Sequence, residues 1–140
     1  METATYLTFR GDCAAAFRFY ADALGGTIEM MMSHGDSPVR DQVPEEWHES
    51  IMHARLRLGN GVLMGSDAPP EHQQIPQGFS VSLSVDSPAD AERMFKALSA
   101  DGTVRMPLQQ TFWASRFGML VDRFGIPWMV NCEAPPASAG

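Results

Sequence analysis

A repeated succession of elements is the feature that most constrains the fold of this chain. In the first half, an alternating stretch at residues 5–9 leads into an amphipathic segment and then into strand-like stretches joined by a tight glycine turn. In the second half, residues 79–85 begin the same succession. Self-similarity of this kind indicates that one supersecondary unit occurs twice. The sequence therefore predicts two β-α-β-β-β modules, at residues 4–67 and 78–133.

Local signals predict one helix in each module. Ser87 is a favourable N-cap residue, and Pro88 suits the first helical turn that follows it. Asp12 stands in the corresponding place before the first helix. Both segments carry apolar residues at helical spacing and end at glycine, Gly25 and Gly102, which accepts the left-handed conformation common at helix C-termini. The apolar stripe of each helix is expected to be buried.

Length and charge bound the classes of function. At 140 residues the chain is long enough for one domain with a real core. The formal net charge is -7 and Lys and Arg are not clustered, which argues against nucleic-acid binding, because that affinity comes largely from neutralised phosphates. No apolar run is long enough to span a membrane, and no secretion signal opens the chain. We expect a cytoplasmic protein that binds neither nucleic acid nor membrane.

The two cysteines form neither a metal-binding nor a disulfide pattern. Cys13 and Cys132 lie near opposite ends of the chain without a Cys-x-x-Cys spacing, so neither a zinc ribbon nor a disulfide framework is indicated. Cys13 follows the predicted cap of the first helix, a place where the helix dipole can lower the pKa of a thiol. Because no histidine base lies near it in the sequence, packing is the favoured role of this side chain.

Three segments depart from the regular pattern. Residues 34–50 and 67–78 contain several prolines, and we expect them to form loops or lids. The last residues, 134–140, are rich in Ala and Pro and are predicted to be a disordered tail.

Several sequence blocks carry a resemblance to a known family. The chain resembles the vicinal-oxygen-chelate superfamily, which includes glyoxalase I, extradiol dioxygenases and fosfomycin- and bleomycin-resistance proteins, and within it the PhnB-like branch. The resemblance covers residues 4–133, and its most specific part is 112–128. It implies an α+β fold in which residues 1–133 are a single domain, whose paired modules form an open eight-stranded cup, and it implies a homodimer. The blocks are residues 6–13, 30–38, 52–56 and 107–128.

The resemblance also locates the positions at which metal-bearing relatives hold a divalent ion. These relatives use His, Gln or Glu at four equivalent strand positions. In this chain the positions fall on Ala4 or Thr5, Met64, Ser80 and Met129. Thioether and hydroxyl groups are poor ligands for metals that favour imidazole and carboxylate. We therefore expect no metal and no other cofactor.

Two strand faces are candidates for ligand contact. His53 alternates with apolar residues and is followed on the same face by Arg55 and Arg57, which makes a polar, cationic face. This face can receive an anionic ligand, or it can simply face solvent or a second chain. Ser80 and Ser82 also alternate with apolar residues, and the resemblance places them inside the cup. They either hydrogen-bond a ligand or line a hydrated hollow.

Aromatic, cationic and thioether side chains supply the other candidates. Trp113, Arg116 and Trp128 belong to the most specific block, and together they suit an aromatic or anionic small molecule. The competing interpretation is that the indoles are core residues and that Arg116 pairs with a nearby carboxylate. Met64 and Met129 suit a pocket that adapts to apolar ligands, or ordinary core packing.

Three classes of function stay open at this point. The favoured hypothesis is a PhnB-like protein that binds a small molecule in its cup without the usual metal. The second is an enzyme of the glyoxalase, dioxygenase or resistance type that has a displaced metal site or no metal, with His53, Arg116 or a loop carboxylate as acid or base. The third is a structural dimer with a vestigial cup. The predicted ligand-binding residues are His53, Met64, Ser80, Ser82, Trp113, Arg116, Trp128 and Met129, and no catalytic residue is assigned.

Overall fold

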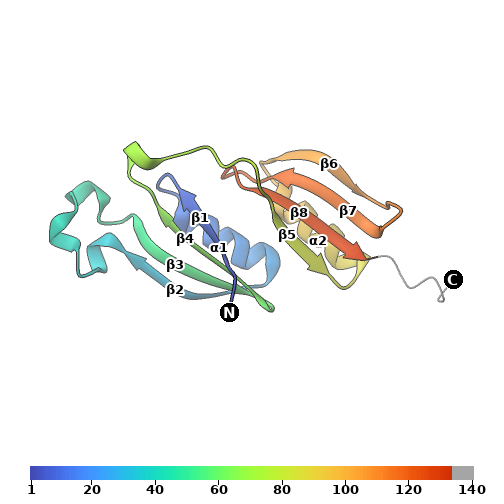
Figure 1. The fold of residues 1–140 in the computed structure, drawn as a ribbon, viewed down its shortest axis with the longest axis horizontal. Coiled ribbons are helices and arrows are strands. Elements are labelled where there is room, and N and C mark those ends of the chain that lie inside the picture. The colour runs from blue at the N-terminus through green and yellow to red at the C-terminus, as the bar shows by residue number, and fades with distance from the viewer. Residues whose placement is uncertain (134–140) are drawn as a thin grey trace. The chain divides into compact units, whose positions relative to one another are not determined.

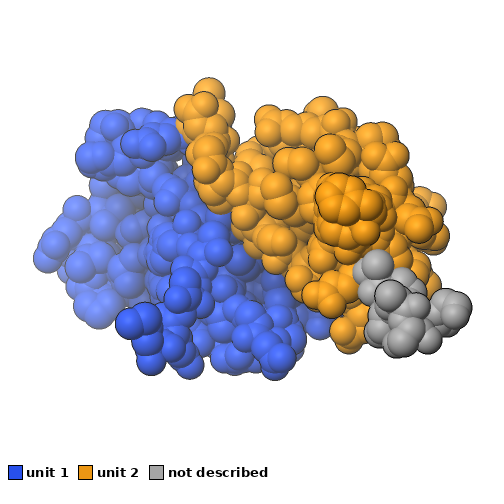
Figure 2. Space-filling view, turned by 45° about the vertical axis from the view of Figure 1, so that its right-hand side comes forward, with its two compact units in different colours: residues 1–74 blue, residues 75–140 orange. Residues whose placement is uncertain are grey.

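A computed structural model describes residues 1–133 of the protein (Figure 1). The chain divides into two compact units, Met1–Gln74 and Ile75–Gly140, shown in separate colours in Figure 2. Within residues 1–133, each unit contains one four-stranded mixed sheet and one α-helix. The predicted α+β fold with a repeated β-α-β-β-β module is therefore confirmed. The predicted tail, 134–140, lies outside the described residues.

The first module is a sheet of order β1-β4-β3-β2 with one helix on one face. Strand β1 runs parallel to β4, while β4 with β3 and β3 with β2 are antiparallel. Short 3-10 turns follow β2 between residues 34 and 47, and another follows β4 at Pro70–His72. The elements are β1 (Thr5–Phe9), α1 (Cys13–Leu24), β2 (Thr27–Ser33), β3 (Ile51–Leu58) and β4 (Gly61–Asp67).

Close packing of α1 on the sheet explains why buried and exposed residues alternate along β1. Leu7 and Phe9 of β1 are buried toward α1, which buries Phe17 and Tyr20 in return. Gly65 of β4 lies where they meet, and a Cβ atom there would be 2.8 Å from the Leu7 carbonyl oxygen and 3.0 Å from the Phe17 ring. Only glycine therefore lets this helix approach the strand so closely.

The start of α1 is fastened by a distant residue and not by the predicted cap. Asp12 has no side-chain capping hydrogen bond. The Cys13 amide, which such a cap would leave to solvent, donates instead to Asp67 Oδ1 at 3.0 Å. Asp67, the buried last residue of β4, also accepts from the amides of Gly11 at 2.9 Å and Ile51 at 2.8 Å. One carboxylate thus ties β4 to the β1–α1 turn and to the start of β3.

The second module repeats the architecture in the order β5-β8-β7-β6. Strand β5 is parallel to β8, and the other neighbours are antiparallel. The predicted N-cap of its helix is confirmed, since Ser87 Oγ accepts from the Asp90 amide at 3.1 Å. The elements are β5 (Val81–Val85), α2 (Pro88–Ser99), β6 (Thr103–Gln109), β7 (Ala114–Val121) and β8 (Pro127–Glu133).

A buried aspartate also organises the second module. Asp122, at the turn between β7 and β8, accepts from the amides of Phe124 at 2.8 Å and Ile126 at 3.0 Å. Its other oxygen accepts from the Trp128 indole at 2.8 Å. This arrangement closes the turn and fixes the largest fully buried side chain of the described residues.

No helix within residues 1–133 is long and apolar enough to cross a membrane.

Candidate functional site

The face of the first sheet opposite α1, here called the open face, carries the polar side chains of the module. Tyr6 and Met64 are register partners on β1 and β4, and Met64 is the register partner of Arg55 on β3. His53 and Arg57 flank Arg55 at two-residue spacing, so all five side chains share this face. The predicted polar, cationic face of β3 is therefore present.

A β-bulge adds a carboxylate to the open face. In β2, Ile28 is paired with Leu56 and Met30 with Arg55, so Glu29 is the extra residue of the bulge. Its Oε1 accepts from Arg55 Nε at 2.9 Å, and its Oε2 accepts from Arg57 Nε at 2.9 Å. These hydrogen bonds, first from Arg57 and then from Arg55, lower the pKa of Glu29. One carboxylate thus fixes two guanidinium groups side by side.

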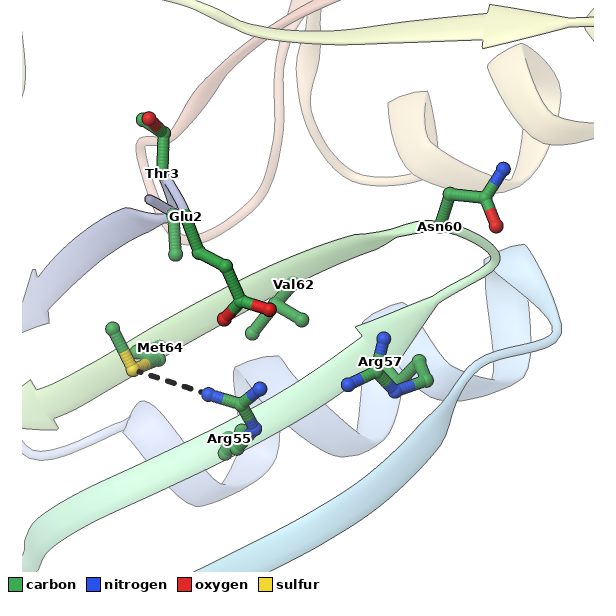
Figure 3. A pocket seen from close by; sticks show the side chains of 8 residues that line it. Glu2, Thr3, Arg55, Arg57, Asn60, Val62 and Met64 are labelled. Atoms are coloured by element: carbon green, nitrogen blue, oxygen red, sulfur yellow. Dashed lines mark hydrogen bonds between the residues drawn. The ribbon is translucent and has the colours of Figure 1, made fainter.

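A hollow of about 370 Å³ lies above these guanidinium groups (Figure 3). Apolar and thioether groups from β4 and from the residues before β1 form part of its wall, and Arg55 and Arg57 supply positive charge. Ligand sites usually combine such apolar walls with a few placed polar groups. The lining residues are Glu2, Thr3, Ala4, Arg55, Arg57, Asn60, Val62 and Met64.

A tyrosine–histidine pair lies further along the same face. Tyr6 Oη is 3.3 Å from His53 Nδ1, and the two rings stack with centroids 5.8 Å apart. Tyr6 remains 47% exposed, so the pair is open to a ligand. His53 and Met64, both predicted to bind ligand, are therefore brought onto one surface with Tyr6 and Arg55.

The second module places other predicted residues on the corresponding face of its own sheet. Ser82 and Met129 are register partners on β5 and β8, on the face opposite α2. Ser80 immediately precedes β5. Asn131, also on this face, has a buried Oδ1 without a hydrogen-bond partner among the described residues. This acceptor was not among the predicted site residues.

Exposed aromatic rings mark the connection between β6 and β7. Phe112 is 95% exposed and Trp113 is 48% exposed. Their rings pack edge to face, with centroids 4.8 Å apart. Trp113 also contacts the Phe117 ring at 5.4 Å. Trp113 is therefore accessible for stacking, and its role in ligand binding stays a prediction.

Two predicted ligand-binding residues lie on the opposite side of the second sheet. Trp128 is 0% exposed, with its indole bound to Asp122, so it belongs to the core. Arg116 is the register partner of buried Cys132 beyond an irregularity in β7, and its Nε donates to Glu92 of α2 at 3.1 Å. Neither side chain lies on the face that carries Ser82 and Met129, which corrects their expected position in the site.

The superfamily's metal positions hold poor donors. Ala4 and Met64 line the hollow of the first module, and Thr5 pairs with Leu63 on the α1 side of the sheet. In the second module, Ser80 immediately precedes β5 and Met129 lies on β8. Among residues 1–133, no three His, Cys, Asp or Glu side chains are grouped to hold a metal ion. The side chains present do not fit the imidazole and carboxylate ligands that such metals prefer.

Cys13 lacks the environment of a reactive thiol. Its side chain is fully buried. Burial raises the pKa of this thiol far above its ordinary value, and the negative charges of Asp67 and Asp12 raise it further. Reactive cysteines need the opposite, an exposed thiol with a lowered pKa. The packing role favoured from the sequence therefore agrees with its surroundings.

Comparison with known proteins identifies the family. The profile of the Glyoxalase/Bleomycin resistance protein/Dioxygenase superfamily matches residues 4–130. The chain belongs to this superfamily. It is 34% identical to protein YjdN of Escherichia coli in an alignment 139 positions long, and the alignment covers 94% of this chain and 95% of YjdN. The predicted resemblance is thereby confirmed at the level of the superfamily.

Solved structures agree with the fold of this superfamily member. Protein PA1353 from Pseudomonas aeruginosa is 51% identical, with a TM-score of 0.87 over 95% of this chain and 98% of PA1353. The PhnB protein from Bacillus cereus is 21% identical, with a TM-score of 0.79 over 94% of this chain and 99% of its own. At that identity the PhnB protein supports the fold alone.

Proposed function

We propose that this superfamily member binds a small organic molecule on the open face of its first sheet and does so without the superfamily's metal. The observation that carries the proposal is the hollow of about 370 Å³, whose lining combines Val62 and Met64 with two oriented guanidinium groups. Its size falls in the range of about 300–1,000 Å³ that is usual for ligand pockets. Met64, which replaces a metal ligand, becomes an adaptable apolar contact.

The proposal is tested with the intact protein. A library of aromatic and anionic metabolites is screened by thermal unfolding, because a ligand that binds only the folded state raises the melting temperature in a saturable manner. Met64→Glu, which places a charge on the apolar wall, is expected to abolish the shift, while the exposed control Asp41→Ala preserves it. A library without any saturable shift contradicts the binding proposal.

Elemental analysis tests the metal-free part separately. We expect far less than one transition-metal ion per purified chain. One tightly held ion per chain, lost on changing His53→Ala, would contradict the proposal and favour an enzyme with a displaced metal site.

The Tyr6–His53 pair supports a second candidate, a metal-free enzyme. A phenol and an imidazole whose Oη and Nδ1 atoms are 3.3 Å apart can act together as general acid and base toward a bound molecule. Under this proposal, His53→Gln abolishes turnover of a bound metabolite but leaves its affinity within a few fold. Unchanged turnover in His53→Gln excludes a catalytic role of the histidine.

We also propose a homodimer. Each sheet ends in unpaired edge strands among the described residues, β1 and β2 in one module and β5 and β6 in the other. Such edges invite pairing with a second chain. Light scattering at micromolar concentration is expected to report twice the 15.4 kDa chain mass, and a monomer would contradict the dimer.

A further inference from the structure

The two guanidinium groups of the open face are oriented before any ligand arrives. Arg55 and Arg57 each donate through Nε to a different oxygen of Glu29, at 2.9 Å in both cases. Holding a long arginine side chain in one geometry normally costs conformational entropy when a ligand binds. Glu29 has already imposed that order, and its contacts engage the Nε edge of each guanidinium. The remaining nitrogens stay available for a second partner.

The remaining nitrogens face the hollow. Arg55 Nη1 lies 3.8 Å from Met64 Sδ, as the dashed line in Figure 3 shows. A thioether sulfur is a weak acceptor, so this contact satisfies the cation poorly. Charge-assisted hydrogen bonds from guanidinium groups to carboxylate or phosphate oxygens are much stronger. An oxyanion of a ligand is therefore the better partner for this edge.

A carboxylate of the chain itself shares the hollow. Glu2 lines it, and Figure 3 shows the Glu2 carboxylate beside Val62. Arg55 and Arg57 carry two positive charges and both pair with the single carboxylate of Glu29, so the carboxylate of Glu2 is the second negative charge at the hollow. Glu2 precedes β1, which begins at Thr5, so its segment can move without breaking a strand pairing. Movement of Glu2 would leave one uncompensated positive charge in the hollow.

We infer that the hollow recognises an oxyanion, a carboxylate or a phosphate group of a small molecule, through the paired guanidinium groups of Arg55 and Arg57, and that this oxyanion displaces the carboxylate of Glu2. The inference rests on the proposed binding function and adds the chemical class of the ligand. Val62 and Met64 provide the apolar contact for the rest of the molecule. A cationic ligand is disfavoured because both guanidinium groups repel it.

The test uses three probes of similar size: phenyl phosphate, benzoate and neutral benzyl alcohol. Each is titrated into the intact protein at low ionic strength and followed by NMR or calorimetry. Saturation by phenyl phosphate or by benzoate, with much weaker binding of benzyl alcohol, supports the inference and shows which oxyanion is preferred. Equal binding of benzyl alcohol overturns it while leaving small-molecule binding intact. Absence of binding by all three probes also overturns it, whereas the library screen decides the proposed function.

Three variants are expected to change the affinity for the anion in different ways. Arg57→Gln is expected to weaken binding of the preferred anion by about tenfold or more, because it removes a charge-assisted contact. Arg93→Gln on α2 removes the same charge from an exposed side chain and is expected to change affinity less than twofold. Glu2→Gln, which lies outside the core, is expected to strengthen binding several fold. Weaker anion binding in Glu2→Gln would refute the displacement, and an unchanged affinity in Arg57→Gln would refute the guanidinium site.

Discussion

Removal of the Asp67 carboxylate tests how the first module is held together. The carboxylate is buried and accepts three backbone hydrogen bonds, from Gly11, Cys13 and Ile51, at 2.9, 3.0 and 2.8 Å. Hydrogen bonds to a charged group contribute roughly 1.5–3 kcal/mol each. Contacts that share one acceptor are not additive. We therefore expect Asp67→Ala to lower the free energy of unfolding by about 4 kcal/mol, a large part of the roughly 5–15 kcal/mol typical of a domain.

The isosteric variant refines the expectation. In Asp67→Asn, the amide oxygen can keep the bonds to Gly11 and Cys13, but the amide nitrogen then meets the Ile51 amide, donor against donor. We expect a loss of about 2 kcal/mol, intermediate between wild type and Asp67→Ala. Asp41→Ala, which removes an exposed carboxylate, is the control and should stay within about 0.5 kcal/mol of wild type.

Urea unfolding followed by circular dichroism measures these differences in unfolding free energy, because a shift in the midpoint urea concentration at an unchanged m-value reports a change in stability. A loss below about 1 kcal/mol in Asp67→Ala would refute the reasoning, because the buried amides of Cys13 and Ile51 cannot both lose their partner at so little cost. The same variant should weaken ligand binding on the open face, since β3 begins at Ile51, two residues before His53.

Two further predictions concern titratable groups. Cys13 should resist a thiol reagent such as DTNB in the native protein and react fully after denaturation, because burial raises the pKa of its thiol; rapid native modification would contradict this. Because the pKa of Glu29 is lowered below its ordinary value of 4.5, its ion pairs stabilise the fold above that pH, and this contribution is lost as the pH falls through the folded pKa. The difference in unfolding free energy between wild type and Glu29→Gln should therefore be constant above pH 5 and shrink below 4.5. A difference that grows on acidification would contradict the assignment.

Sequence patterns predicted what is decided locally. The Ser87 cap depends on a neighbouring amide three residues away, and the alternation on β1 and β3 depends on which face meets a helix. The Asp12 cap was predicted by the same local rule and was wrong: Asp12 makes no side-chain capping hydrogen bond, and the helix start is held through the Cys13 amide by Asp67, 54 residues along the chain. A partner at that distance leaves no local signal.

The candidate site was predicted less completely, for reasons that can be traced to strand geometry. Trp128 and Met129 are adjacent in β8, and adjacent strand residues point to opposite faces, so both could not line one surface. Arg116 lies beyond a register irregularity, and Glu29 is the extra residue of a bulge. Bulges reverse the expected face of a side chain, and neither is visible in the residue pattern.

The charges around Met64 show why the superfamily's metal chemistry would not return through a single ligand. Arg55 Nη1 lies 3.8 Å from Met64 Sδ, so a guanidinium stands beside the position where relatives place a metal ligand. A divalent cation at that place would be repelled by Arg55 and by Arg57. A carboxylate introduced by Met64→Glu would pair with Arg55 instead of binding a metal. Under the proposed function, the arginines, Glu29 and the apolar wall of the first module suit an anion, and we expect that metal binding would need both arginines to be replaced as well.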